Sequence, residues 1–325
     1  MIENVTTFGY FLSCEEYSPA ELLEQSRLAE EAGFDALWIS DHYHPWTSQQ
    51  GESPFVWAMI GAISQVCDLP VTTAVTCPTI RIHPAVIAQA AATSALLLGD
   101  GKFCLGLGSG EALNEHVLGD VWPPADTRLE MLEEAVEVIR KLWTGEDVTH
   151  HGQHYSVENA RIWSLPDTAP RISISGFGPK ATDLAARIGD AYTTTTPDHE
   201  LLKRFRSKAK DGATAQAGFK VAWADTEDEG WDHAYRIWPN AGLPGELSQV
   251  LPTVEHFEQA STLVTREQTA ESVTAGRDPA QHAEAFAPFH EAGFEEIYVA
   301  NMGPNYADMI RGYGREVLPR LRGAT

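Results

Sequence analysis

The stretch Ala36-Leu37-Trp38-Ile39-Ser40-Asp41-His42-Tyr43-His44-Pro45-Trp46 decides the fold class. Its first four residues form an apolar run typical of a buried strand, and a carboxylate, an imidazole and an indole follow directly. Parallel α/β folds build their active sites from polar side chains at the carboxyl ends of their strands. The stretch therefore predicts an enzyme with a site at this strand exit.

A second stretch repeats the pattern further along the chain. Residues 103–115 read Phe-Cys-Leu-Gly-Leu-Gly-Ser-Gly-Glu-Ala-Leu-Asn-Glu, an apolar strand that runs into a glycine-containing turn and then a helix. The carboxylate at this exit is Glu111. Ionisable side chains at the carboxyl ends of two different strands strengthen the enzyme hypothesis.

Strands and helices alternate along the whole chain. The predicted strands are Thr7–Leu12, Ala36–Ser40, Val71–Cys77, Phe103–Gly108, Ile172–Ser175, Ala191–Thr195, Phe219–Ala224 and Glu296–Ala300. Apolar residues at three- and four-residue spacing predict helices over Pro19–Ala32, Pro84–Leu98, Thr127–Trp143, Pro179–Ile188 and Pro279–Ala292. Alternation of this kind predicts a parallel sheet, and eight units close a (β/α)8 TIM barrel.

Two junctions near the ends of the chain support this repeated architecture. Ala-Gly-Phe follows a helix at Ala32-Gly33-Phe34 and again at Ala292-Gly293-Phe294, and each glycine is placed to end its helix. Insertions are expected at residues 43–56, from about 145 to 168, and from about 225 to 266. Since no linker composition separates two halves, we expect one domain over residues 1–325.

The bulk composition excludes some classes of partner. The 325 residues are 43% hydrophobic, enough for a large core, and the formal net charge is −23. A surface this acidic repels a phosphate backbone, so nucleic acid and anionic membranes are not expected partners.

The four cysteines show no paired spacing of the kind that binds zinc, and three lie in or beside apolar runs. The first residues, Met1-Ile2-Glu3-Asn4, lack the basic and apolar regions of a signal peptide, and no run approaches a membrane span. We therefore expect a cytoplasmic protein without disulfides.

Two polar clusters have simpler interpretations than a binding site. His150, His151 and His154 surround a glycine-containing turn in a predicted β-excursion, and their spacing fits no closed metal site. No metal is therefore expected. The acidic run at residues 225–229 is typical of a solvated helix start.

Taken together, these motifs resemble the luciferase-like superfamily, and within it the coenzyme F420-dependent glucose-6-phosphate dehydrogenase family. The matching pieces are Ser40-Asp41-His42 with Pro45-Trp46, residues 78–81 (Pro-Thr-Ile-Arg) with 83–90, residues 108–115, and Gly178-Pro179 with Gly189-Asp190. The resemblance runs over nearly the whole chain. It implies a barrel that binds the deazaflavin at its mouth and passes a hydride between the cofactor and an alcohol or carbonyl carbon.

The resemblance also implies catalytic roles. His42 is the base or a stabiliser of the substrate oxygen, Glu111 the acid that serves the reduced cofactor, Trp46 a pocket wall, and Glu15 a carboxylate pointing into the pocket. Without the resemblance, His42 is a local hydrogen-bonding group and Glu111 a residue favoured by the helix dipole. The acid role requires a raised pKa, which apolar neighbours provide by desolvation.

The implied cofactor contacts come from several strand exits. They are Asp41, Ala74, Val75, Cys77, Ser109, Gly110, Asn114, Ser175, Gly176, Phe177, Gly178 and Thr195. Ala74-Val75 aligns with a bulge that carries a non-proline cis peptide. Ser175 to Gly178 precede a helix opened by proline, an arrangement suited to the phosphodiester.

The chain departs from the family where relatives hold a sugar phosphate with lysines. Asp198 and Glu271 stand at these positions, and carboxylates there repel a phosphate dianion. We therefore expect a neutral or cationic alcohol, sugar or carbonyl substrate. An FMN-dependent monooxygenase and a non-catalytic deazaflavin or flavin carrier are the alternative hypotheses, and the family habit implies a homodimer.

Overall fold

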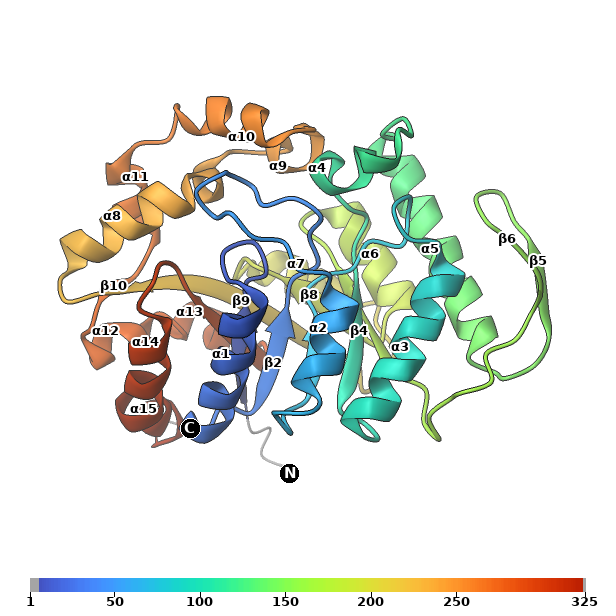
Figure 1. Cartoon of the computed structure of the whole chain (residues 1–325), viewed down its shortest axis with the longest axis horizontal. Coiled ribbons are helices and arrows are strands. Elements are labelled where there is room, and N and C mark those ends of the chain that lie inside the picture. Colours follow the sequence, from blue (N-terminus) through green and yellow to red (C-terminus); the bar gives the residue numbers. More distant parts are fainter. Residues whose placement is uncertain (1–5, 324–325) are drawn as a thin grey trace.

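The computed structural model describes residues 6–323, so the expectation drawn from Met1 to Asn4 lies outside the described residues. Eight parallel strands close into a barrel in the order β1, β2, β3, β4, β7, β8, β9 and β11, which then pairs with β1 (Figure 1). Their bounds are β1 Thr7–Leu12, β2 Ala36–Ile39, β3 Val71–Thr73, β4 Phe103–Leu107, β7 Arg171–Ser175, β8 Ala191–Thr194, β9 Thr214–Trp223 and β11 Glu296–Asn301. The predicted TIM barrel is confirmed.

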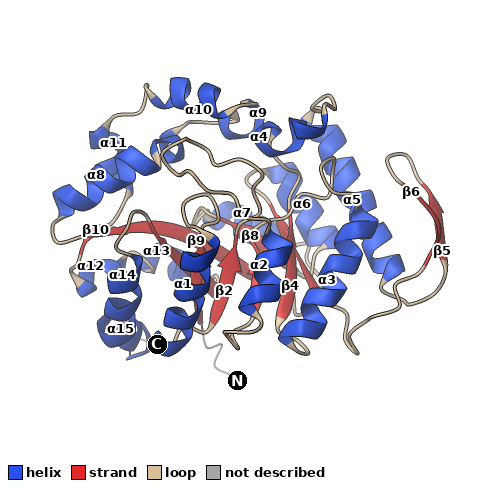
Figure 2. Ribbon diagram, in the orientation of Figure 1, coloured by secondary structure: helices blue, strands red, loops and turns tan. Residues whose placement is uncertain are grey.

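Helices surround the barrel, with the strands inside (Figure 2). The bounds are α1 Pro19–Ala32, α2 Val56–Ile63, α3 Pro84–Leu98, α4 Ala112–Glu115, α5 Ala125–Leu142, α6 Pro179–Ile188, α7 His199–Arg206, α8 Glu227–Ile237, α9 Leu247–Val250, α10 Val254–Ser261, α11 Arg266–Ser272, α12 Pro279–Glu284, α13 Ala287–Ala292, α14 Tyr306–Gly312 and α15 Leu318–Gly323. Two short 3-10 helices, η1 His116–Leu118 and η2 Pro239–Gly242, and a short π-helix, η3 Tyr313–Val317, complete the set. Gly33 and Gly293 end their helices with φ of 85° and 99°, as the repeated junction predicts.

Three predicted elements were wrong in their extent. The helix expected over Pro279–Ala292 is two helices, α12 and α13, because Pro288 has no N–H for the backbone ladder and its ring crowds the preceding turn. Strand β3 ends at Thr73 instead of Cys77, and only an isolated bridge at Thr76 continues its pairing with β4. Strand β9 begins at Thr214, before the apolar run at Phe219, because its small and polar residues pair with β8 and β11.

Aromatic rings fill the barrel interior below its mouth. Trp38 and Tyr298 stack with centroids 4.4 Å apart, and Phe11 packs edge-on against Trp38 at 5.7 Å. Glycines make the room: a Cβ at Gly218 would stand 2.4 Å from the Trp38 ring, and one at Gly9 2.1 Å from the Tyr298 ring. Side chains further along these strands therefore form the floor of the mouth.

The three segments that we expected to be insertions lie outside the eight barrel strands. Residues 43–56 form a long loop after β2 that leads into α2. β5 (Val148–His151) and β6 (Ser156–Ala160) make an antiparallel hairpin beside α5, and α8 to α11 lie over the carboxyl ends of the strands (Figure 1). The short β10 (Ala275–Gly276) pairs with β9 as the chain returns from this cover.

Candidate active site

Three strand exits bring an imidazole between two carboxyl groups. His42 Nε2, after β2, lies 3.3 Å from Glu15 Oε1, after β1, and 3.6 Å from Glu111 Oε1, after β4. His42 and Glu15 are 9% and 3% exposed, and the side chain of Glu111 is 26% exposed. The side chains of His42 and Glu111, which the sequence analysis singled out, therefore lie together, and Glu15 lies beside them.

Asn114 fixes the tautomer of His42. Asn114 Oδ1 accepts hydrogen bonds from the backbone N–H groups of Tyr43 and His44, at 2.8 and 3.0 Å. The amide NH2 therefore faces the imidazole, and Nδ2 lies 2.9 Å from His42 Nδ1. Since Nδ2 is a donor, Nδ1 is an acceptor and the proton of neutral His42 is on Nε2, between the two carboxyl groups.

The two carboxyl groups have pKa values displaced in opposite directions. Burial raises the pKa of Glu15, but His42, Lys220 and a 2.6 Å hydrogen bond from Ser40 outweigh it, so the pKa lies below its ordinary value. Burial raises the pKa of Glu111, which His42 offsets only in part, so this pKa lies above its ordinary value. Two neighbouring carboxyl groups whose pKa values are displaced in opposite directions are typical of acid and base roles.

Asp41 belongs to a second, fully paired network. Its Oδ2 accepts from Thr76 Oγ1 at 2.8 Å and its Oδ1 from Arg81 Nη2 at 2.9 Å. The same arginine donates through its backbone N–H to Glu115 Oε2 at 2.7 Å, and burial raises the pKa of Glu115. Asp41 thus carries an ion pair with Arg81, a partner that its sequence neighbours do not reveal.

Trp46 lies against the histidine as a wall. Its ring centroid is 4.9 Å from that of His42 and 5.0 Å from that of Phe257 in α10. Its backbone N–H donates to Gln50 Oε1 at 2.8 Å. The loop after β2 and the cover helices therefore hold this indole beside the imidazole.

The exits of β3 and β4 approach each other closely. The Ala74–Val75 peptide is cis, as the resemblance implied. A Cβ at Gly108 would stand 2.7 Å from Val75, and one at Gly110, whose φ is +81°, 2.4 Å from Cys77 Sγ. Only glycine at these positions leaves the two turns this close, and Ser109, between them, is partly exposed.

The exits of β7 and β8 form a separate part of the mouth. A Cβ on Gly108 would lie 3.8 Å from Ser175 Cβ, which places the end of β7 beside the β4 turn. Gly176 is held by Tyr192, whose hydroxyl donates to its carbonyl at 2.7 Å. Gly178 is the N-cap residue of α6 and offers no side-chain hydrogen bond to the first turn of the helix. Phe177 and Thr195 are exposed.

Lys220 is a site residue that the sequence analysis missed. It projects from β9 into the mouth, and its Nζ donates to Ser13 Oγ at 2.7 Å. The ammonium lies 3.8 Å from the ring centroid of Trp238 and 4.4 Å from that of Phe11. A lone lysine inside the apolar run at residues 219–224 was the available signal.

Glu16 was also missed. Its carboxyl group accepts hydrogen bonds from Trp238 Nε1 and from the backbone N–H of Gly303, the latter at 2.6 Å. Burial raises its pKa to about 7, against these two hydrogen bonds and Lys220. A further carboxyl group with a raised pKa therefore follows Glu15 directly in the chain.

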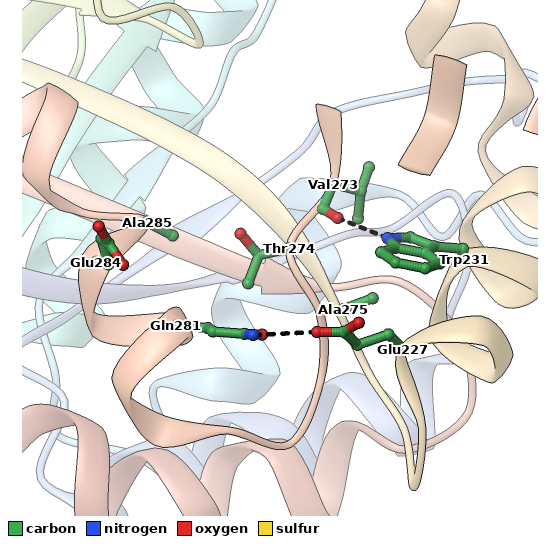
Figure 3. A pocket seen from close by; sticks show the side chains of 8 residues that line it. All are labelled: Glu227, Trp231, Val273, Thr274, Ala275, Gln281, Glu284 and Ala285. Atoms are coloured by element: carbon green, nitrogen blue, oxygen red, sulfur yellow. Dashed lines mark hydrogen bonds between the residues drawn. The ribbon is translucent and has the colours of Figure 1, made fainter. Parts of the chain in front are cut away.

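A surface hollow of about 300 Å³ lies elsewhere, between α8 and α12 (Figure 3). Trp231 donates to the carbonyl of Val273 at 3.0 Å, and Gln281 to Glu227 at 3.0 Å. Its lining includes Glu227 and Glu284 but no histidine, so it offers no acid–base pair like that of the barrel mouth. The barrel mouth is the better candidate.

The hairpin histidines each face a separate carboxylate. His150 pairs with Glu134 at 3.1 Å, while His151 and His154 contact Glu158 and Glu130. Within residues 6–323, no group of three or more histidine, cysteine and acidic side chains is placed to hold a metal. All four cysteines are buried and free.

The fold and site define a (β/α)8-barrel enzyme with acid–base side chains at its mouth. The family described as luciferase-like monooxygenase matches residues 6–296, and the chain belongs to this luciferase-like family.

Curated relatives extend the likeness over the full length. F420-dependent glucose-6-phosphate dehydrogenases of Microbacterium testaceum (strain StLB037) and Nakamurella multipartita are 36% and 34% identical, each over 97% of this chain and over 97% and 96% of their own.

Solved structures of F420-dependent enzymes resemble this chain over nearly its whole length. An F420-dependent secondary alcohol dehydrogenase in complex with an F420-acetone adduct is 28% identical with a TM-score of 0.89, and 98% of this chain and 99% of that one are covered. The coenzyme F420-dependent tetrahydromethanopterin reductase from Methanopyrus kandleri, 17% identical with a TM-score of 0.78, shares the fold. In the part of the chain that the structure describes, each helix is too short or too polar to span a membrane.

Proposed function

We propose that this protein is a coenzyme F420-dependent oxidoreductase that interconverts an alcohol and a carbonyl compound. The observation that carries the proposal is the imidazole of His42, held by Asn114 with Nε2 between the carboxyl groups of Glu15 and Glu111. The full-length likeness to F420-dependent dehydrogenases supports the cofactor.

The mouth fits a deazaflavin. Gly108 and Gly110 leave the exits of β3 and β4 close together, where a Cβ would collide with Val75 and Cys77. The uncapped amino end of α6 after Gly178 suits a phosphodiester. The residues that would hold the cofactor are Asp41, Ala74, Val75, Cys77, Ser109, Gly110, Asn114, Ser175, Gly176, Phe177, Gly178 and Thr195.

The cofactor, when bound, supplies a carbon centre that takes or gives a hydride. His42 donates its Nε2 proton in a hydrogen bond to the substrate oxygen, which holds the reacting carbon in place. Glu15, ionised because its pKa is lowered, takes the hydroxyl proton during alcohol oxidation. Glu111, whose pKa is raised, holds a proton for the cofactor side, and Trp46 closes the pocket wall.

The substrate is a non-phosphorylated alcohol, sugar or carbonyl compound. Asp198 caps α7 by accepting from the backbone N–H of Leu201 at 2.9 Å, and Glu271 is exposed on α11. Neither provides a cation for a phosphate. The first test is therefore a panel of secondary alcohols, sugars and sugar phosphates, scored by loss of deazaflavin fluorescence.

The panel also separates the alternatives. Turnover of an alcohol, with glucose 6-phosphate among the poorest substrates, is expected. Efficient glucose 6-phosphate oxidation would overturn the substrate class, and no turnover despite deazaflavin binding would favour a carrier. Purification with bound FMN and oxygen-dependent turnover would favour the monooxygenase.

A homodimer and a cytoplasmic location belong to the same proposal. Val86, Leu96 and Leu97 on α3 are each about half exposed, and Val66 after α2 is 36% exposed. An apolar face of this kind supports self-association, which light scattering of the purified protein measures. The four free cysteines support a reducing compartment.

A further inference from the structure

Gln50 ties the backbone of Trp46 to the helices that cover the barrel mouth. Its side-chain Oε1 accepts a hydrogen bond from the N–H of Trp46 at 2.8 Å. Its Nε2 donates to the carbonyl of Ile237 at 3.1 Å and to Asn240 Oδ1 at 3.3 Å. Gln50 is 4% exposed, and a buried amide whose oxygen and two N–H groups are all paired has one orientation. These three contacts therefore fix the side chain in place.

The carbonyl of Ile237 is a partner that itself needs a hydrogen bond. Ile237 is the last residue of α8, and the carbonyl groups of the last turn of a helix have no partner within the helix. Thr47 Oγ1 donates to the same carbonyl at 3.3 Å. Two side chains of the loop after β2, those of Thr47 and Gln50, therefore satisfy the end of a cover helix.

Two side-chain amides together hold each backbone N–H of residues 43–46. Asn114 Oδ1 accepts those of the first two residues, and Gln50 Oε1 accepts that of the fourth. The third residue is Pro45, which has no N–H. Asn114 therefore sets the end of this segment next to His42, and Gln50 sets the other end.

The indole of Trp46 lies between the imidazole and the cover. Its ring centroid is 4.9 Å from that of His42, and Phe257 of α10 meets it edge-on at 5.0 Å. A shift of the Trp46 backbone therefore moves the indole relative to the imidazole to which the substrate oxygen binds.

We propose that Gln50 is a positioning residue that holds Trp46 beside His42 and so fixes one wall of the substrate pocket. This inference rests on the proposed function, in which Trp46 is the pocket wall and His42 binds the substrate oxygen. Gln50 acts on the substrate through the backbone of Trp46.

The test removes the hydrogen bonds of Gln50 and follows Trp46 by fluorine NMR. Gln50→Met keeps the length of the side chain without its amide, and Gln50→Glu keeps its shape but, at pH 8, places a carboxylate against the Ile237 carbonyl. Gln49→Met, at the exposed neighbouring position, is the matched control. In cofactor-free protein labelled with 5-fluorotryptophan, the resonance that Trp46→Phe abolishes is expected to shift or broaden in both Gln50 variants. It is expected to stay in place in Gln49→Met.

Thr47→Val separates positioning of Trp46 from a general weakening of this region. It removes the other side-chain hydrogen bond to the Ile237 carbonyl and leaves the contact between Gln50 and Trp46 in place. The Trp46 resonance is therefore expected not to move in this variant. An unmoved resonance in either folded Gln50 variant overturns the inference, as does an equal shift in Thr47→Val.

Turnover supplies the second readout. In Gln50→Met, KM for the alcohol is expected to rise about tenfold while kcat changes little, because a displaced wall weakens substrate binding and the contact of Asn114 with His42 remains. An unchanged KM would overturn the inference. Failure of the wild type to oxidise any alcohol would overturn the proposed function, whereas the shifted resonance would still report the effect of Gln50 on Trp46.

Discussion

Asn114 donates a hydrogen bond from its side-chain amide to Nδ1 of His42 over 2.9 Å, and this contact determines how the imidazole can act. The amide cannot turn over without losing two backbone hydrogen bonds to its oxygen. The histidine is therefore presented as an Nε2–H donor. The sequence left open whether it is a base or a stabiliser, and the geometry favours the stabiliser.

Asn114→Asp is expected to change the tautomer without removing the two backbone contacts. A carboxylate facing Nδ1 draws a proton to that atom, so Nε2 loses its proton or the ring becomes a cation. We expect kcat/KM to fall about 100-fold, a typical effect of mispositioned proton transfer. Nitrogen NMR shifts of His42 measure the tautomer directly. Unchanged shifts together with full activity would contradict the assignment.

Glu111→Gln is expected to remove the acid and leave the protein as stable as the wild type at neutral pH. Burial raises the pKa of Glu111 because it disfavours the charged carboxylate, and the amide has the same shape without that charge. The expected outcome is a fall in kcat of about 100-fold with little change in the unfolding temperature. Glu137→Gln, an exposed change on α5, is the control. A large loss of stability with retained turnover would show that Glu111 is structural.

Arg81→Met is expected to destabilise the fold strongly. The arginine and its partner Asp41 are 8% and 1% exposed at their side chains, and Glu115 depends on the same cation. Loss of one partner from a buried ion pair costs about 3–5 kcal/mol. Arg187→Met, which breaks the exposed pair with Glu133, should cost about 1 kcal/mol or less. Urea unfolding compares the two variants. Equal losses of unfolding free energy would show that the buried Arg81 network stabilises the fold no more than the exposed ion pair.

Glu16→Gln is expected to change how stability depends on pH. Burial raises the pKa of Glu16 from 4.5 to about 7 in the folded protein, so between these values the unfolded chain releases a proton that the folded chain keeps. The wild type therefore loses stability as pH rises through this window, by about 3.5 kcal/mol at most, because one pKa unit corresponds to about 1.4 kcal/mol. The difference in unfolding free energy between the variant and the wild type should grow in the variant's favour from pH 5 to 8. A constant difference would contradict the raised pKa.

Local sequence patterns identified much of the barrel and its mouth. Apolar runs located the eight strands, and two glycine junctions located helix ends, because both depend on neighbouring residues. His42 and Glu111 were recognisable because each follows a strand exit. The break at Pro288 was also local, but the continuous helical spacing on both sides concealed it.

Partners far apart in the chain were not predictable in the same way. Arg81 meets Asp41 across 40 positions and Asn114 meets His42 across 72, and only barrel closure brings them together. Lys220 lay inside an apolar run, and its inward direction depends on the register of β9 with β11. Protonation states follow from such contacts, so they required the structure.

The assigned roles of His42, Glu15 and Glu111 all depend on the proposed hydride transfer between a substrate carbon and the deazaflavin at the barrel mouth. A secondary alcohol carrying deuterium on its carbinol carbon, incubated with the protein and oxidised coenzyme F420, tests this most directly by mass spectrometry of the reduced cofactor. We expect one deuterium on the cofactor and the matching ketone as product, with neither formed by His42→Ala. Oxidised alcohol with no deuterium in the cofactor would contradict it.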